Sequence, residues 1–500
     1  MSIDPETIKK ERSAGWREAL RAKTKNKDRI AIERVHMPEL EPEIRVHHQD
    51  REVNRGLTLA QASLEASRCM DCVNPTCIEG CPVSINIPKF VKYIENGDIL
   101  NAASTLKETN ALPAVCGRVC PQEKQCESRC FYVEKLHKPS VAIGHLERFA
   151  ADFERDSGNC NIPETLPPNG IKVATVGSGP AALSFAGDMV KYGYDVTVFE
   201  ALHEIGGVLK YGIPEFRLPN AIVDFEIENL RKMGIKFVTN FIVGRTASFD
   251  DLKEEGFQGF FIGSGAGLPR FMEIPGENYN GILSSNEYLT RVNLMGANSD
   301  ESDTPVLRGK NVAVIGGGNT AMDSVRTALR LGAEKATIIY RRSEVEMPAR
   351  VEEVKHAKEE GVEFMTLCNP VEYFADKNGR VNRMRVVRMG LGEPDASGRR
   401  RPIVLEGSEF DLHVDLVIVA VGVSPNPLVP ASLPGLKVSR WGTLIVDEDK
   451  MQTSLPEMFA GGDIVRGGAT VILAMGDGRR AAEHMHAFLE TERRGDEGTK

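Results

Sequence analysis

Two short cysteine runs hold most of the sulfur that this chain could use for chemistry. Eight of its ten cysteines lie between positions 69 and 130 of 500 residues. The runs CMDCVNPTCIEGCP and VCGRVCPQEKQCESRCF contain four each: Cys69, Cys72, Cys77 and Cys81, then Cys116, Cys120, Cys126 and Cys130. Thiolates bind structural zinc and hold iron–sulfur clusters, and both kinds of centre take four ligands. The runs therefore predict two metal centres, with free or regulatory thiols as the alternative.

The spacing of the first run favours iron over zinc. Bacterial ferredoxins use C-x2-C-x2-C-x3-C-P, in which the fourth cysteine serves the other cluster. Here the gap between Cys72 and Cys77 is four residues, which departs from that pattern, but Cys81 is still followed by Pro82. A thiolate at that chain reversal is expected to point away from the other three. We therefore expect two [4Fe–4S] clusters, with two zinc sites as the alternative.

A first dinucleotide-binding pattern lies in IKVATVGSGPAALSFAGDMVKYGYDVTVFE (171–200). An apolar strand runs into a glycine-rich turn, a helix and a second strand that ends at Glu200. Gly177 permits the tight turn, and Gly179 lets the backbone approach a pyrophosphate at the helix N-terminus. Ala182 keeps helix and strand close, and Glu200 can accept hydrogen bonds from ribose hydroxyls. The pattern predicts dinucleotide binding; the alternative is a similar fold without a ligand.

A second pattern of this kind lies in NVAVIGGGNTAMDSVRTALRLGAEKATIIYRR (311–342). Its loop carries the same three kinds of residue: Gly316, Gly318 and Ala321. The second strand ends in Arg341 and Arg342 where the first pattern has an acid. Arginine suits a 2′-phosphate, which a carboxylate would repel. We therefore expect NADP(H) here, with two merely solvated arginines as the alternative.

A third motif, MFAGGDIVRGGATVILAMGDGRRAAEHM, lies near the C-terminus. After a short strand at 458–460, Gly461, Gly462 and Asp463 predict a tight turn whose acid meets the ribityl or pyrophosphate part of a flavin. A helix from about residue 469 would point its N-terminus at the isoalloxazine ring and stabilise negative charge on reduced flavin. The alternative is an ordinary turn before a terminal helix.

The segments around the cysteines are predicted to be helical. LTLAQASLEASRCMDC has apolar residues at helical spacing, with Thr58 as N-cap. IPKFVKYIENGDILNAASTLKETN predicts two more helices that are separated at Gly97-Asp98. The stretch SGNCNIPETLPPNG (157–170), rich in Pro, Gly and Asn, predicts a linker.

Composition excludes other classes of protein. The net charge of −9 disfavours nucleic acid as the main partner. The first residues, MSIDPETIKKERS, have no apolar core and do not predict a signal peptide. The longest apolar run, LVIVAV (416–421), has the length of a buried strand and is too short to cross a membrane. We expect a cytoplasmic protein, and in that reducing environment clustered cysteines bind metal or do redox chemistry more often than they form structural disulfides.

Together these motifs resemble the family of the glutamate synthase small subunit. That family includes the large subunit of the electron-bifurcating NADH-dependent ferredoxin:NADP oxidoreductase and the N-terminal half of dihydropyrimidine dehydrogenase. The resemblance covers about residues 35–490. Its marks are both cysteine runs, GRVCPQEKQCE, VAIGHLERF, GGVLKYGIPEFRLP (206–219), GGGNTAMD and AGGDIVRG. HMPELEPEIRVHHQDREVNRGLTLAQASLEASRC looks closest to the bifurcating enzyme's large subunit.

The resemblance implies FAD in the first dinucleotide unit, with Gly207 among its binding residues, and NADPH in the second. It also implies two [4Fe–4S] clusters with crossed ligands. The first would take Cys69, Cys72, Cys77 and Cys130, and the second Cys81, Cys120, Cys126 and Glu147. Cys116 would then lie near a cluster without binding it; the alternative is that Cys116 completes the second site.

The implied fold class is α/β with an N-terminal all-α iron–sulfur domain and two Rossmann-like domains, the NADPH domain inserted in the FAD domain. The expected boundaries are a helical domain at 1–165, FAD domain parts at 166–288 and 437–500, and the NADPH domain at 289–436.

The implied activity is hydride transfer between NADP(H) and FAD, followed by single-electron transfer through the clusters to a partner subunit. Because cofactors carry this chemistry, no catalytic side chain is expected. The partner would be a small ferredoxin-reductase-like flavoprotein or the large subunit of glutamate synthase, with ferredoxin as a further candidate. Nucleic acid and membrane are not expected as partners.

Two other functions are considered. A disulfide reductase needs a dithiol beside the flavin, but Cys368 is the only cysteine after Glu200. The other alternative is an electron-relay or scaffold subunit that binds the cofactors without turnover of its own.

Overall fold

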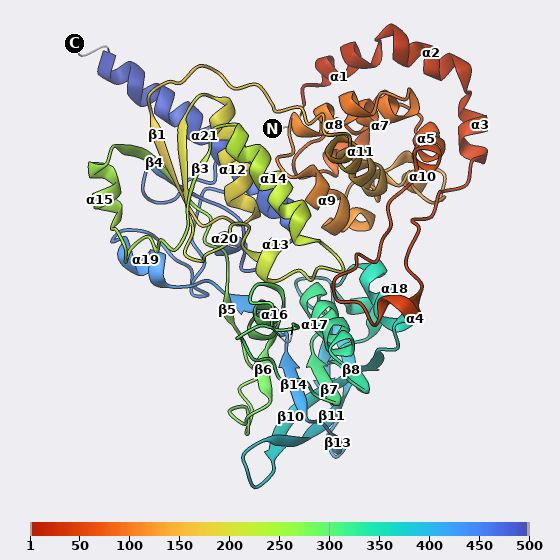
Figure 1. Cartoon of the computed structure of the whole chain (residues 1–500), viewed down its shortest axis with the longest axis vertical. Coiled ribbons are helices and arrows are strands. Elements are labelled where there is room, and N and C mark those ends of the chain that lie inside the picture. Colours follow the sequence, from red (N-terminus) through yellow and green to blue (C-terminus); the bar gives the residue numbers. More distant parts are fainter. Residues whose placement is uncertain (1–2, 300, 498–500) are drawn as a thin grey trace.

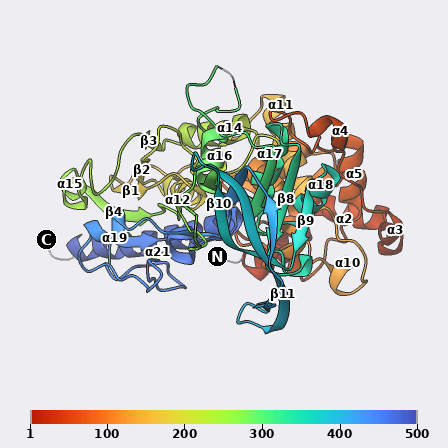
Figure 2. The same ribbon diagram turned by 90° about the horizontal axis from the view of Figure 1, so that it is seen from below.

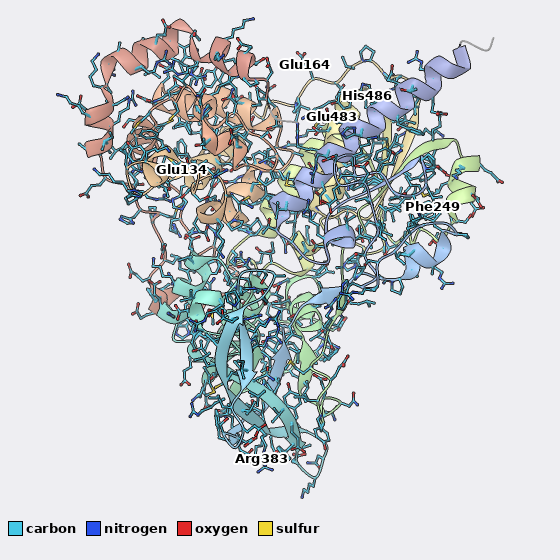
Figure 3. All side chains as sticks on the ribbon, turned by 180° about the vertical axis from the view of Figure 1, so that it is seen from behind. Glu134, Glu164, Phe249, Arg383, Glu483 and His486 are labelled. Atoms are coloured by element: carbon cyan, nitrogen blue, oxygen red, sulfur yellow. The ribbon has the colours of Figure 1, made fainter. Side chains whose placement is uncertain are left out.

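The computed structural model describes residues 3–299 and 301–497. The chain forms a helical unit, a first sheet unit and a second sheet unit (Figure 1). From behind, Glu134 marks the helical unit, Phe249 the first sheet unit and Arg383 the far end of the second (Figure 3). Among the described residues, no helix combines the length and apolar character needed to span a membrane.

The helical unit comes first in the chain. Its helices are α1 (Pro5–Arg12), α2 (Gly15–Lys23), α3 (Asn26–Ala31), α4 (Pro42–Arg45), α5 (Leu59–Ser67), α6 (Thr76–Glu79), α7 (Ile87–Glu95), α8 (Ile99–Lys107), α9 (Pro113–Val119), η1 (Gln122–Lys124), α10 (Phe131–Glu134) and α11 (Ile143–Ser157). Thr58 caps α5 in a reciprocal pair with Gln61, which confirms the predicted N-cap. Gly97, at a φ of +81°, separates α7 from α8 as the sequence predicts, and Asp98 caps α8.

The first sheet unit is a five-stranded parallel sheet in the order β16-β4-β1-β2-β3. Its strands are β1 (Lys172–Val176), β2 (Asp195–Phe199), β3 (Lys236–Val238), β4 (Phe257–Ile262) and β16 (Met458–Ala460). Its helices are α12 (Pro180–Lys191), α13 (Val208–Tyr211), α14 (Asn220–Lys232), α15 (Phe249–Glu254), α19 (Leu428–Ser432), α20 (Asp463–Arg466) and α21 (Val471–Glu497).

The second sheet unit has a parallel sheet in the order β6-β14-β7-β8-β9 and an antiparallel sheet formed by β10 to β13. The parallel strands are β6 (Ile282–Ser284), β7 (Asn311–Ile315), β8 (Lys335–Tyr340), β9 (Glu363–Thr366) and β14 (Leu416–Val419). The antiparallel strands are β10 (Cys368–Ala375), β11 (Val381–Pro394), β12 (Arg400–Val404) and β13 (Phe410–His413). The helices are α16 (Ser285–Asn293), α17 (Asn319–Arg330), η2 (Glu344–Glu346) and α18 (Val351–Glu359). Seen from below, β11 projects away from both parallel sheets (Figure 2).

The second sheet unit is inserted into the first, which confirms the predicted fold class. The chain enters through β5 (Leu268–Pro269) and returns through β15 (Val423–Ser424), and these two strands pair. The junctions differ from those expected at 289 and 436. β6 already pairs with β14 in the second sheet, so that unit begins before 289. Val429, Leu433 and Leu436 pack in the core of the first sheet unit, so the return precedes 436.

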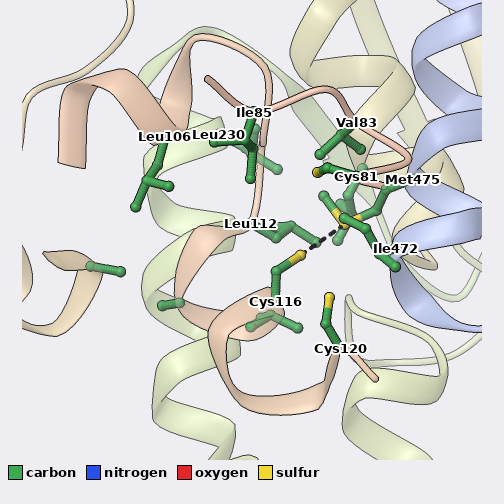
Figure 4. Close-up of a cluster of buried hydrophobic side chains, with 14 of the residues drawn as sticks. Cys81, Val83, Ile85, Leu106, Leu112, Cys116, Cys120, Leu230, Ile472 and Met475 are labelled. Carbon is green, nitrogen blue, oxygen red and sulfur yellow. Dashed lines mark hydrogen bonds between the residues drawn. The ribbon is translucent and has the colours of Figure 1, made fainter. Parts of the chain in front are cut away.

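The helical unit and the first sheet unit share one hydrophobic core. Leu112 and Cys116 from the helical unit pack with Leu230 of α14 and Met475 of α21 (Figure 4). At the same interface Glu226 of α14 accepts a 2.6 Å hydrogen bond from the backbone N–H of Ala114, in the first turn of α9. The linker therefore joins units that are packed against each other.

A strap, residues 32–58 with α4, leaves the helical unit and lies over α18 (Figure 1). Buried Arg45 pairs there with Glu359 at 2.6 Å and Glu360 at 2.9 Å. Further along, Glu52 pairs with Arg118 of α9 at 2.9 Å, and the N–H of Val53 donates to the carbonyl of Phe216. The strap thus binds all three units together.

Candidate cofactor sites

The first set of four cysteines converges on one small cavity in the helical unit. Cys69 and Cys72 lie in the loop after α5, Cys77 lies in α6, and Cys130 precedes α10; all four line this cavity. Burial, followed by the negative charge of neighbouring thiolates, raises the pKa of Cys72 to about 12. Since all ten cysteines are free, these thiols remain available as ligands.

A second set surrounds a buried carboxylate. Glu147 of α11 lies near Cys81, Cys120 and Cys126. Burial, with the negative charge of Glu147 as a further cause, raises the pKa of Cys81 and of Cys126. The pKa of Cys120 is raised first by a hydrogen bond with Cys116 and then by burial. Glu147 is 5% exposed and accepts a 2.8 Å hydrogen bond from Nδ2 of Asn110. Burial raises the pKa of Glu147 to about 8. Three thiols and one carboxyl thus form a second group of four donors.

Cys116 lies beside this second set and contacts α21. Its Sγ is 3.5 Å from Sδ of Met475 and 3.7 Å from Oδ1 of Asn110. Figure 4 shows the thiol directed towards Met475, with Cys120 one turn further along the chain. Cys116 also bonds the thiol of Cys120, and that bond is the largest cause of the raised pKa of Cys120.

The first glycine loop has a backbone that only glycine adopts readily. Gly177 has a φ of +91°, and a Cβ there would lie 2.8 Å from the carbonyl oxygen of Gly263. A Cβ on Gly207 would lie 3.0 Å from Cα of Gly179, so two loops meet closely at the N-terminus of α12. Glu200, at the end of β2, accepts hydrogen bonds from the backbone N–H of Ser178 at 2.9 Å and of Leu202 at 2.8 Å.

The second glycine loop has the same constraint. Gly316 has a φ of +143°, and a Cβ there would lie 2.4 Å from the carbonyl oxygen of Ala420. After the loop, Oδ1 of Asn319 accepts a 2.8 Å hydrogen bond from the N–H of Arg350. The guanidinium of Arg350 donates to the carbonyl of Arg118 at 2.7 Å and to Gln122 at 3.0 Å. The nucleotide loop is therefore connected to the turn that holds Cys120.

One cavity of about 1800 Å³ lies between the two sheet units and includes both loops. Ten of the predicted residues line it: Gly177, Gly179, Glu200, Gly207, Gly316, Gly318, Arg341, Arg342, Gly462 and Asp463. Ala182 and Ala321 do not line it; both are fully buried in helices that follow the loops. Their location fits the packing role predicted for them.

The two predicted arginines differ in their surroundings. Arg342 is buried, and its guanidinium donates to Asp395 at 2.8 Å and to the carbonyl of Arg400 at 2.7 Å. Arg341 is exposed at the cavity and makes no ion pair within the described part of the chain. Partial burial and the charges of Arg342 and Arg399 lower the pKa of Arg341.

The C-terminal motif forms the predicted turn. Gly462 has a φ of +78°, and its N–H donates to Asp477 at 3.1 Å. Asp463 accepts a 2.9 Å hydrogen bond from the N–H of Ala469, and burial raises the pKa of Asp463 to about 6. α21 begins at Val471, two residues after the expected start.

The sequence did not reveal a buried ion pair that also lines the cavity. Arg217 of the first sheet unit contacts both carboxylate oxygens of Asp323 on α17 at 2.7 Å. Glu353 of α18 lies 3.1 Å from Arg217. Arg217 lies in the motif GGVLKYGIPEFRLP and Asp323 in GGGNTAMD. Their presence in these motifs was the only feature of the sequence that could have indicated the ion pair. This pair links the two sheet units at the cavity wall.

The donors fit the groups that the sequence implies. Among the described residues, neither set brings three donor atoms within 4.8 Å of one another. The donors are therefore spaced too widely for one tetrahedral ion and suit a larger iron–sulfur cluster. The large cavity carries a glycine loop on each side, and its wall includes Ser264, whose buried hydroxyl has no hydrogen-bond partner among the residues that the structure describes. A flavin and a nicotinamide dinucleotide can therefore share this cavity.

Comparison with known proteins matches the helical unit and the two sheet units to different families. Residues 45–159 match the family described as dihydropyrimidine dehydrogenase domain II, 4Fe-4S cluster. Residues 171–478 match the pyridine nucleotide-disulphide oxidoreductase family. The fold of the chain is similar to that of Mycobacterium tuberculosis FprA in complex with NADPH, with a TM-score of 0.55 and 20% identity, covering 66% of this chain and 86% of FprA.

Full-length relatives combine both halves. The chain is 38% identical over 461 residues to the glutamate synthase [NADPH] small chain of Azospirillum brasilense, covering 91% of this chain and 95% of that protein. It is 37% identical over 448 residues to the NADPH-Fe(3+) oxidoreductase subunit beta of Geobacter sulfurreducens, covering 85% of this chain and 65% of that protein. The chain belongs to the family of the glutamate synthase [NADPH] small chain and is an NAD(P)H-dependent flavin oxidoreductase with a 4Fe–4S domain.

Proposed function

We propose that this chain passes a hydride between NADP(H) and FAD and single electrons through two [4Fe–4S] clusters to a partner subunit. The observation that carries the proposal is the single cavity lined by both glycine loops, next to a helical unit with two convergent donor sets. When bound, the flavin accepts two electrons from the nicotinamide and exchanges them singly with the clusters. The shared core of the helical unit and the first sheet unit keeps the two kinds of site in one rigid arrangement.

In this proposal the two sides of the cavity hold different dinucleotides. The FAD side has Gly177, Gly179, Glu200, Gly207, Gly462 and Asp463, with Ala182 packing beneath. The NADPH side has Gly316, Gly318 and Arg341, with Ala321 packing beneath. The N-termini of α12 and α17 each follow a glycine loop and offer free N–H groups to a pyrophosphate.

The proposed cluster ligands are the two donor sets of the helical unit. Cys69, Cys72, Cys77 and Cys130 hold the first cluster, and Cys81, Cys120, Cys126 and Glu147 hold the second. Two cations hold the loop of the first site: Nζ of Lys92 donates to the carbonyl of Cys69, and Arg29 donates to the same carbonyl at 3.3 Å. Both side chains also pair with Glu95.

We propose a partner of the kind found in the ferredoxin:NADP oxidoreductase, a small ferredoxin-reductase-like flavoprotein, with ferredoxin as a further electron carrier. A second candidate is the large subunit of glutamate synthase, which is favoured by the 95% coverage of the Azospirillum small chain. Isolation of the native complex distinguishes the two, because a glutamine-dependent partner carries an amidotransferase domain and a flavoprotein partner carries flavin of its own.

Metal and flavin analysis of anaerobically purified protein tests the proposal. We expect about eight irons and one FAD per chain, since each [4Fe–4S] cluster has four irons. NADPH should bleach the flavin absorbance, and the protein should reduce an artificial dye. Stoichiometric zinc without iron would refute the cluster assignment, and cofactor binding without dye reduction would favour a relay subunit.

A further inference from the structure

We propose that Arg399, on the hairpin between β11 and β12, reads the 2′-phosphate of NADP(H) together with Arg341. The inference deepens the proposed function and rests on its assignment of NADP(H) to the second glycine loop. The residue that recognises the 2′-position ordinarily follows the second strand of the dinucleotide unit directly. Arg399 lies outside that motif, on a hairpin that comes later in the chain. The antiparallel sheet inserted after β9 would thus contribute to cofactor choice.

Arg399 and Arg341 line the same cavity from different elements. Arg341 follows β8 and is exposed, whereas Arg399 precedes β12 and is partly exposed; Asn369 lines the same cavity. Among the described residues neither arginine forms an ion pair with a carboxylate. Arg399 uses only Nε, which donates to the hydroxyl of Ser397 at 3.0 Å, so its terminal nitrogens remain available for a ligand.

The hairpin turn that carries Arg399 is fixed in position by Asp395. One carboxylate oxygen of Asp395 accepts from the N–H of Ser397 at 2.8 Å, and the other accepts from Arg342 at 2.8 Å. The N–H of Asp395 in turn donates to the carbonyl of Arg399 at 2.8 Å. Arg342 is therefore a positioning residue: it ties the end of β8 to the hairpin and places Arg399 beside Arg341.

The charge balance points to a ligand with more than one negative charge. Arg341, Arg342 and Arg399 all line the cavity, and Asp395 is the acid that pairs with Arg342. A phosphate monoester carries between −1.5 and −2 near neutral pH and offers three acceptor oxygens. It can therefore bind both free guanidinium groups at once, which the uncharged 2′-hydroxyl of NAD(H) cannot do.

Calorimetric titration of the FAD-loaded protein with adenosine 2′,5′-bisphosphate and with 5′-AMP tests the inference without redox turnover. Wild type should prefer the bisphosphate. Arg399→Ala should weaken bisphosphate binding about ten- to hundredfold, the range of a hydrogen bond to a charged group, and leave 5′-AMP unchanged. Arg399→Lys should retain part of the preference. Arg401→Ala is the matched control, because Arg401 lies on β12 and does not line the cavity.

The outcomes separate the inference from the proposed function. If wild type prefers the bisphosphate and Arg399→Ala binds it equally well, the role of Arg399 is overturned and the NADP(H) assignment stands. If wild type does not distinguish the two ligands, the NADP(H) assignment fails and the inference fails with it. An equal loss in Arg401→Ala would show a general charge effect and would also overturn the specific role of Arg399.

Discussion

Replacement of Glu147 tests how the second cluster is held. The carboxylate is buried among Cys81, Cys120 and Cys126. Glu147→Ala removes one of four donors, and we expect iron to fall from about eight to about four per chain, because only one [4Fe–4S] cluster becomes labile. The first cluster should keep its spectrum, since its four thiols line a separate cavity.

The hydrogen bond from Asn110 gives a graded version of the same test. It joins Nδ2 to Oε1 of Glu147 at 2.8 Å, and a hydrogen bond to a charged group contributes about 1.5–3 kcal/mol. Asn110→Leu should therefore speed loss of the second cluster to a chelator by roughly 10- to 150-fold. The pKa of Glu147 is about 8 without the metal, so below pH 8 its carboxyl group must lose a proton before it binds the cluster. This should weaken the free energy of cluster binding by about 1.4 kcal/mol for each pH unit below 8. Deprotonation of the thiols adds to this pH dependence.

Anaerobic iron and sulfide analysis with EPR of the dithionite-reduced protein is the assay. Glu147→Cys should retain about eight irons and change one EPR signal, because ligand identity alters the cluster. Cys116→Ala is the control and should keep both clusters, since that thiol faces Met475. If Cys116→Ala loses four irons and Glu147→Ala keeps eight, Cys116 is the ligand and the assignment is wrong.

Two further changes test the nucleotide loop and the interface of the helical unit. Gly316→Ala places a Cβ 2.4 Å from the carbonyl oxygen of Ala420; it should weaken NADPH binding at least about tenfold while FAD content stays constant, and equal loss of both cofactors would contradict a local effect. Burial raises the pKa of Glu226 from 4.5 to about 7, so its ionisation opposes folding, and stability falls by about 3 kcal/mol in total as the pH rises from about 4.5 to about 7. Glu226→Gln keeps an oxygen for the N–H of Ala114 and should remove this loss, which urea unfolding at pH 5 and pH 8 measures; an unchanged pH dependence would count against it.

Local patterns carried much of the prediction. A glycine loop between a strand and a helix is encoded within about 30 residues, and both loops lie where the sequence places them. The N-cap at Thr58 is local in the same way. The cysteine runs were also recognisable by their spacing. The assignment of Cys130 to the same cluster as the first run came from family resemblance, because no local rule connects residues so far apart.

Tertiary contacts decided what the sequence left out. Arg341 and Arg342 are adjacent residues of the same type, and both line the cavity. Only the fold shows that Arg342 is already paired, with Asp395 on a hairpin distant in sequence. The junction expected at 289 was wrong because β6 is three residues long and is recognisable only by its pairing with β14. Arg217 and Asp323 likewise form an ion pair only because the fold brings the two sheet units together.

The strap has a consequence for biosynthesis. Its Arg45 leaves the ribosome early, but Glu359 and Glu360 follow more than three hundred residues later. A buried charge without its partner is costly, so the strap closes only after the second sheet unit has folded. All proposed cluster ligands have been synthesised once Glu147 is made, whereas Arg350, which covers the turn at Cys120, is made much later. Translation therefore leaves an interval in which the cysteine loops are complete but not yet covered, and iron can be delivered during that interval.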